Sequence, residues 1–171
     1  MACFPGYRQG IGTDTYLQPA TGVGDEGGFA PPITHLAEAL DLLEKAVHSC
    51  NYTGRIKYAI DPASSEFFRP DGTYDIGFKT KSPDPRSSRE MQELYQEVLF
   101  RYPVVLLEDP FAEDDWDSWV EFNRACEVEL VGDDLLATNV ERVRVAGERA
   151  ACNSMLLKVN QIGTVSEAID A

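Results

Sequence analysis

Short apolar runs alternate with amphipathic stretches along most of this chain, and a charged residue closes each run. The closing residues are Asp61, Glu108, Asp133 and Lys158, and the last three are spaced 25 residues apart. That interval suits a strand, a helix and two loops. The repeat predicts an α/β fold with a parallel sheet. Because parallel strands bring their carboxyl ends to one edge, we expect these charged side chains to converge there.

The spacing of hydrophobic residues along the chain predicts the strands and helices. Strands are predicted at 56–60, 104–107, 128–132 and 154–159. Helices are predicted at about 34–49 and near 139–148. Another begins at a capping box of Ser87 and Glu90 and ends at Pro103, one follows a cap at Asp114 or Asp115, and a last one begins at Thr164. An insertion with a hairpin turn at Asp71-Gly72 explains the longer interval between Asp61 and Glu108. Four strands are half of an eight-stranded (β/α) barrel, and both edges of such a sheet would lack a neighbour.

Composition narrows the class of function. The 171 residues carry a net charge of −14, which argues against binding to nucleic acids or to anionic membranes. No apolar run approaches the roughly 20 residues of a membrane span, and the N-terminus lacks a signal-peptide pattern. Scattered cysteines form no metal-ligand cluster and suggest reduced thiols in a cytoplasmic protein: Cys3, Cys50, Cys126 and Cys152.

The converging charges indicate a metal site with a base beside it. Two carboxylates about 4 Å apart repel each other by about 4 kcal/mol at an effective dielectric constant of about 20. Mg²⁺ held by Asp61, Glu108 and Asp133 would relieve this repulsion. Lys158 could act as a base if nearby cations lower its pKa; alternatively, it forms a salt bridge that offsets the carboxylates. Glu26 lies on a glycine-flanked loop that could approach a ligand or could be only a turn.

Five stretches carry a family resemblance. They are Val-Gly-Asp-Glu-Gly-Gly-Phe-Ala-Pro at 23–31, Ser-Glu-Phe-Phe at 65–68, Glu-Asp-Pro-Phe-Ala-Glu-Asp-Asp-Trp at 108–116, Gly-Asp-Asp-Leu at 132–135 and Leu-Leu-Lys-Val-Asn-Gln-Ile-Gly-Thr at 156–164. In this order they resemble the C-terminal barrel domain of the enolases over about residues 22–171. Residues 1–21 take no part in the resemblance and are expected to form an irregular leader.

The resemblance implies a partial TIM-like barrel and a lyase activity, phosphopyruvate hydratase. This activity is the reversible, Mg²⁺-dependent dehydration of 2-phosphoglycerate to phosphoenolpyruvate in glycolysis. By motif match, Lys158 would be the base and Glu26 would help to protonate the departing hydroxide. Asp61, Glu108 and Asp133 would hold Mg²⁺, and Glu108 and Asp133 would also lie near the substrate. A full-length protein of this kind is expected to be a homodimer.

The sequence also departs from the enolase pattern. The N-terminal capping domain and the last barrel strands have no counterpart in this chain, and Pro62 follows Asp61 where a small aliphatic residue is usual. We therefore expect a truncated form with doubtful activity on its own. One alternative is an inactive remnant that binds metal or an enolase subunit. Another is a member of the same superfamily that acts on acid sugars.

Overall fold

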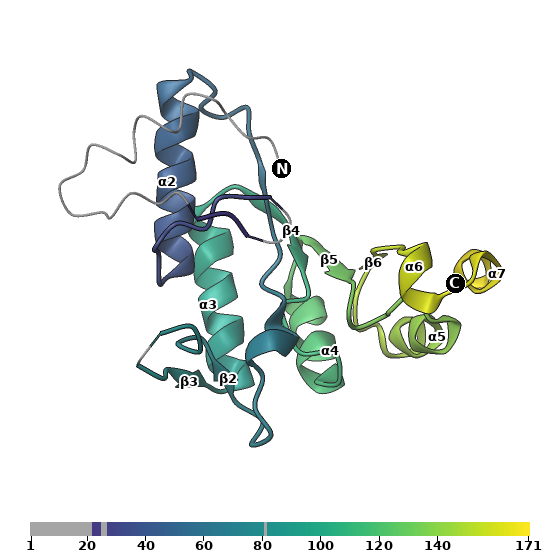
Figure 1. Cartoon of the computed structure of the whole chain (residues 1–171). Helices are drawn as coiled ribbons and strands as arrows, with labels where there is room; N and C mark the ends of the chain where they lie inside the picture. Colours follow the sequence, from purple (N-terminus) through teal and green to yellow (C-terminus); the bar gives the residue numbers. More distant parts are fainter. Residues whose placement is uncertain (1–21, 25–26, 81) are drawn as a thin grey trace. The chain divides into compact units, whose positions relative to one another are not determined.

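The computed structural model describes residues 22–24, 27–80 and 82–171. The chain divides into two compact units, one up to Arg55 and one from Ile56 to Ala171. The described part of the first unit contains a short loop, in which Val23 pairs with Phe29, and helix α2 (Leu36–Ser49) (Figure 1). The observed bounds of α2 confirm the helix predicted at about 34–49.

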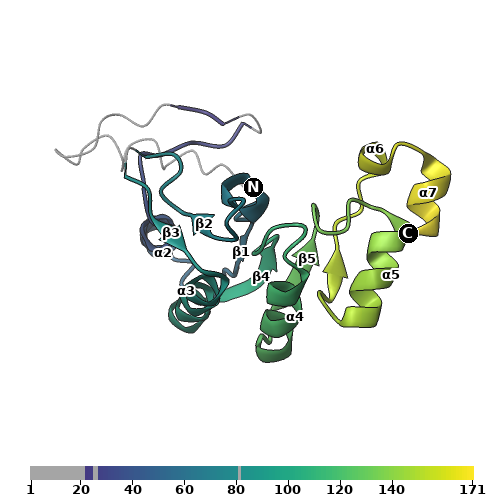
Figure 2. The ribbon, with the colours of Figure 1, turned by 90° about the horizontal axis from the view of Figure 1, so that it is seen from below.

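The second unit is built on a parallel sheet of four strands. Its order is β1 (Tyr58–Ile60), β4 (Val104–Glu108), β5 (Glu129–Gly132) and β6 (Ser154–Met155). The connecting helices α3 (Ser88–Arg101), α4 (Trp116–Ala125) and α5 (Val140–Arg149) follow one side of the strands (Figure 2). This alternation confirms the predicted α/β class and has the arrangement of part of a (β/α) barrel.

Helices α3 and α4 and the last helix of the chain begin at side chains that accept backbone hydrogen bonds, as the sequence indicates. Ser87 and Glu90 form the predicted capping box of α3. Asp115 rather than Asp114 caps α4, and Thr164 caps α7 (Val165–Asp170). Each cap satisfies an N–H group that has no partner inside its helix. Among the helices of the described ranges, none combines the length and the apolar character needed to cross a membrane.

The strand predicted at 154–159 is wrong beyond Met155. The backbone N–H of Leu156 still donates to the carbonyl of Gly132, at 3.1 Å. Two residues later the backbone N–H of Lys158 donates instead to the side-chain hydroxyl of Thr138, at 2.9 Å. This contact takes the chain out of the ladder, and the short helix α6 (Val159–Ile162) follows with Lys158 at its N-cap.

The insertion between β1 and α3 is ordered by buried side chains. It contains the 3₁₀ helix η1 (Ser64–Phe67) and the antiparallel pair β2 (Tyr74–Asp75) and β3 (Pro85–Arg86). The predicted hairpin turn is confirmed: Phe68 bridges Tyr74, and Gly72 adopts a φ of 82°. The hydroxyl of Tyr74 donates to Asp115 Oδ2 at 2.7 Å and accepts from the N–H of Ala112 at 3.0 Å. The insertion is thereby joined to the loop after β4.

Phe111 lies at the centre of an aromatic cluster beneath the loop that follows β4. Its ring is fully buried, with centroids 5.5 Å from Phe122, 5.9 Å from Tyr95, 6.2 Å from Trp119 and 6.3 Å from Tyr74. All four contacts have the edge-to-face geometry that favours aromatic pairs. This cluster fixes the loop directly after Glu108 by packing.

We expect Tyr74→Phe to reduce the free energy of unfolding by about 1–3 kcal/mol, because the N–H of Ala112 would lose its buried acceptor. Urea denaturation followed by circular dichroism measures this change. Tyr52→Phe is the control, since Tyr52 is 40% exposed, and it should change stability by less than about 0.5 kcal/mol. Equal stabilities of Tyr74→Phe and the unmodified protein would contradict a structural role for this hydroxyl.

Candidate active site

The parallel sheet brings the expected site residues to one edge. Asp61 directly follows β1, Glu108 is the last residue of β4, and Asp133 directly follows β5. Lys158 lies beyond β6, at the N-cap of α6. Glu26 lies outside the described residues, so its place relative to the others stays a prediction.

Lys158 and Asp133 form an ion pair. The Lys158 Nζ atom donates to Asp133 Oδ2, and Gln161 Nε2 donates to Asp133 Oδ1 at 3.1 Å. Asp133 is buried, whereas 42% of the Lys158 side chain is exposed. The hydrogen bond to Asp133 raises the pKa of Lys158, with smaller contributions from the charges of Asp133 and Glu108. The amine is therefore held as an ammonium ion while this contact persists.

The carboxylates at this edge disfavour one another's ionisation. Burial raises the pKa of Glu108 to about 7, and the charges of Asp61 and Asp133 add to the shift. Burial also raises the pKa of Asp61, opposed by a hydrogen bond from the N–H of Ala63 and reinforced by Asp133. Carboxylate oxygens are the ligands that a hard divalent cation prefers. That Asp61, Glu108 and Asp133 together hold such a cation stays a prediction.

Asp109 stabilises the carboxyl edge of the sheet through hydrogen bonds to backbone groups. Its buried carboxylate accepts the backbone N–H of Asp133 at 3.0 Å and that of Asp134 at 2.8 Å. Its own N–H donates to Val131 at 3.0 Å, and its carbonyl accepts from the N–H of Ser64 at 3.1 Å. Asp109 thus joins the ends of β4 and β5 to the segment after β1. Burial raises its pKa to about 6, although the two accepted N–H groups lower it.

The carboxylates of Asp109, Asp133 and Asp134 each offer an oxygen within 4.8 Å of the others, and such a group could hold a metal ion. This cluster shares only Asp133 with the set expected from the sequence. Both oxygens of Asp109 already accept backbone N–H groups. Asp109 therefore serves the edge chiefly by holding the loop after β5 in place.

Comparison with known families supports the fold. Residues 9–171 match the family model of the enolase C-terminal TIM barrel domain. The chain belongs to this enolase family. The match covers every described site residue and begins ahead of residue 22, where the motif resemblance starts. Its family is one of lyases.

Three residues at the enolase-type edge were not assigned a role from the sequence: Asp109, Thr138 and Gln161. Asp109 and Gln161 lie inside the family motifs, which is a signal for both. Thr138 offers no such signal, yet it is fully buried and accepts the backbone N–H of Lys158. Thr138 and Ala137 both adopt positive φ angles, 50° and 48°. Non-glycine residues rarely adopt this conformation, so surrounding contacts must hold the loop.

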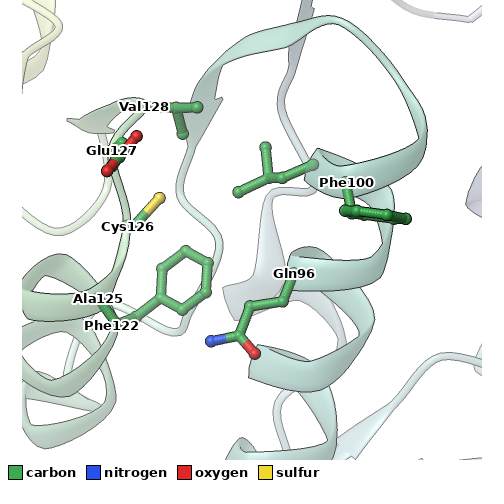
Figure 3. Close-up of a pocket in the computed structure, with 8 residues that line it drawn as sticks. Gln96, Phe100, Phe122, Ala125, Cys126, Glu127 and Val128 are labelled. Carbon is green, nitrogen blue, oxygen red and sulfur yellow. The ribbon is translucent and has the colours of Figure 1, made fainter.

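A cavity of about 290 Å³ lies away from these charges (Figure 3). Its walls come from the C-terminal parts of α3 and α4 and from the residues that lead into β5, and they include Gln96, Phe122 and Cys126. The cavity is thus at the amino end of β5, whereas Asp133 follows its carboxyl end. None of the expected site residues that the structure describes lines it, so cavity volume alone would not locate this site.

The raised pKa of Glu108 has a consequence for the metal-free enolase-family chain. Because folding raises this pKa from 4.5 to about 7, the folded state retains a proton that the unfolded state loses between these values. The contribution of protonated Glu108 to folding stability is complete below pH 4.5 and is lost as pH rises through about 7. In buffer containing a chelator, Glu108→Gln should therefore raise Tm relative to the unmodified protein more at about pH 8 than at about pH 4.

Thermal unfolding of both proteins at the two pH values measures this difference. Glu121→Gln on α4 is the control for the loss of one carboxylate, because Glu121 is exposed and lies on a helix away from the carboxyl ends of the strands. Equal effects of Glu108→Gln at both pH values would contradict the crowded arrangement of carboxylates.

Proposed function

We propose that this enolase-family chain carries the metal-binding and proton-abstracting part of an active site that interconverts 2-phosphoglycerate and phosphoenolpyruvate. The observation that carries the proposal is the contact between the Lys158 amine and Asp133, at the edge where β1 and β4 deliver Asp61 and Glu108. A base beside a set of carboxylates is what removal of a proton next to a substrate carboxylate requires.

Asp61, Glu108 and Asp133 would hold Mg²⁺, and Glu108 and Asp133 would also face the substrate. When bound, the metal would stabilise the negative charge that develops on the substrate carboxylate. The support for this assignment is the donor set, which consists of oxygen atoms from the ends of three adjacent strands. Asp109 is a weaker candidate because both its oxygens are engaged.

Lys158 would take the proton from the carbon next to the substrate carboxylate. The adjacent carbon then loses hydroxide, and Glu26 would help to protonate that leaving group, so that water is released. Lys158 must be neutral at its Nζ atom to accept the proton. Asp133 raises the pKa of this amine, so the reaction requires that Asp133 be partly neutralised or drawn away. In the reverse direction the same ammonium group returns the proton.

The small-molecule substrate, the cytoplasmic location and a homodimer of the full-length enzyme form part of this proposal. A second candidate is a protein that binds metal or an enolase subunit without catalysis. The observation that favours it is the sheet order, since β1 and β6 each have one strand neighbour in the part of the chain that the structure describes. Strands with a free side can pair with another chain.

The test is exchange of the hydrogen next to the carboxylate of 2-phosphoglycerate in D₂O, with and without Mg²⁺. Exchange requires only proton removal, so it remains measurable where full dehydration is slow. We expect Mg²⁺-dependent exchange by the unmodified protein and a loss of about 10²–10⁴-fold in Lys158→Met. Lys45→Met, which alters an exposed lysine of α2, should exchange at the unmodified rate.

Exchange that persists in Lys158→Met would overturn the assignment of the base. Calorimetric binding of Mg²⁺ without any exchange would favour the second candidate. Absence of both Mg²⁺ binding and exchange would overturn the metal site together with the proposed reaction.

A further inference from the structure

Arg142 on α5 contacts two loops at once. Its guanidinium group donates to the backbone carbonyl of Glu113 in the loop after β4 and to that of Leu135 in the loop after β5. Two of its nitrogens lie 3.3 Å from Asp114 Oδ1. Its central carbon lies 5.1 Å from the centre of the Trp116 ring, which lies against the guanidinium. One side chain thereby connects α5 to both loops.

Both loops lie directly beside residues of the candidate site in the sequence. Leu135 is the second residue after Asp133, and Glu113 is the fifth after Glu108. The backbone N–H of Glu113 also donates to Ser65 Oγ at 3.0 Å, in the segment that follows Asp61. The contacts of Arg142 therefore act on the loops beyond the carboxylates, whereas Asp109 joins the strand ends beneath them.

We propose that Arg142 is a positioning residue that fixes the separation of the loop after Glu108 and the loop that bears Asp133, and so strengthens divalent-cation binding by these two carboxylates. This inference rests on the proposed function for its metal, and on the hydrogen bonds of Arg142 for its geometry. The guanidinium touches neither carboxylate. It acts through two backbone carbonyls.

The choice of arginine follows from the number and direction of the bonds. A guanidinium group is planar and presents five N–H donors, so it can donate to Glu113, Leu135 and Asp114 while its face lies on Trp116. A lysine at this position keeps the charge but offers one nitrogen at the end of a flexible stem. The ion pair with Asp114 contributes little by itself, because 75% of the Asp114 side chain is exposed. The hydrogen bonds to the two backbone carbonyls are therefore the contacts that position the loops.

The test compares Arg142→Lys with Arg144→Lys. Arg144 lies on the same helix and, among the described residues, pairs only with Glu141 and Glu148, within α5. Both substitutions preserve net charge, so a change in Mg²⁺ affinity cannot come from the overall field. At a temperature where circular dichroism shows both variants folded, we expect Arg142→Lys to weaken Mg²⁺ binding about tenfold, as loss of an outer supporting contact does. Arg144→Lys should bind Mg²⁺ as the unmodified protein does.

A second readout needs no metal. Amide hydrogen exchange, resolved by residue in NMR spectra, reports on the N–H groups of Asp133 and Asp134, which donate to Asp109. These two amides should exchange faster in Arg142→Lys than in Arg144→Lys, while amides within α3 keep their rates. Unchanged exchange at Asp133 and Asp134, or equal acceleration throughout the second unit, would overturn the positioning role.

Faster exchange at these amides with unchanged Mg²⁺ affinity would overturn the link between Arg142 and the metal. If the unmodified protein binds no Mg²⁺, the proposed function fails, and this result equally overturns the role of Arg142 in cation binding. The exchange rates then decide separately whether Arg142 holds the two loops.

Discussion

The buried carboxylate of Asp109 is the interaction on which the carboxyl edge of the sheet depends. One residue bonds β5 through its backbone N–H, the segment after β1 through its carbonyl, and the loop after β5 through both side-chain oxygens. A carboxylate that accepts two backbone N–H groups is well satisfied in a buried position. These hydrogen bonds consequently fix the position of the loop bearing Asp133 relative to the end of β4, where Glu108 lies.

Holding acids together has a cost that the remainder of the unit must offset. Glu108 and Asp61 both have raised pKa values, so their ionised forms are disfavoured in the folded chain. In the loop after β4 and the helix that follows it, Phe111 and Trp119 are fully buried in the aromatic cluster. Fully burying a large apolar side chain contributes about 1.5–3 kcal/mol. The cluster thus supplies stability next to the place where the carboxylates withdraw it.

The sequence predicted what local patterns encode and missed what depends on contacts between distant segments. The parallel sheet, the Ser87 cap and the Asp71-Gly72 turn follow from periodicity and turn chemistry. Lys158 was expected at a strand end, but Thr138, 20 residues earlier, takes its N–H and turns the chain away. The bonds of Arg142 to carbonyls 7 and 29 residues away leave no local pattern either.

Asp133 connects the two halves of the proposed chemistry. Its carboxylate is a candidate metal ligand and also the main cause of the raised pKa of Lys158. An ammonium ion cannot accept a proton, so Lys158 becomes able to accept one only when Asp133 pairs with another cation and the pKa of the amine falls. Gln161 holds the second oxygen of Asp133 and keeps this carboxylate within reach of both. Metal binding and deprotonation of Lys158 therefore depend on the same two oxygens of Asp133. Lys158 would act as a base only after the neighbouring carboxylates are neutralised.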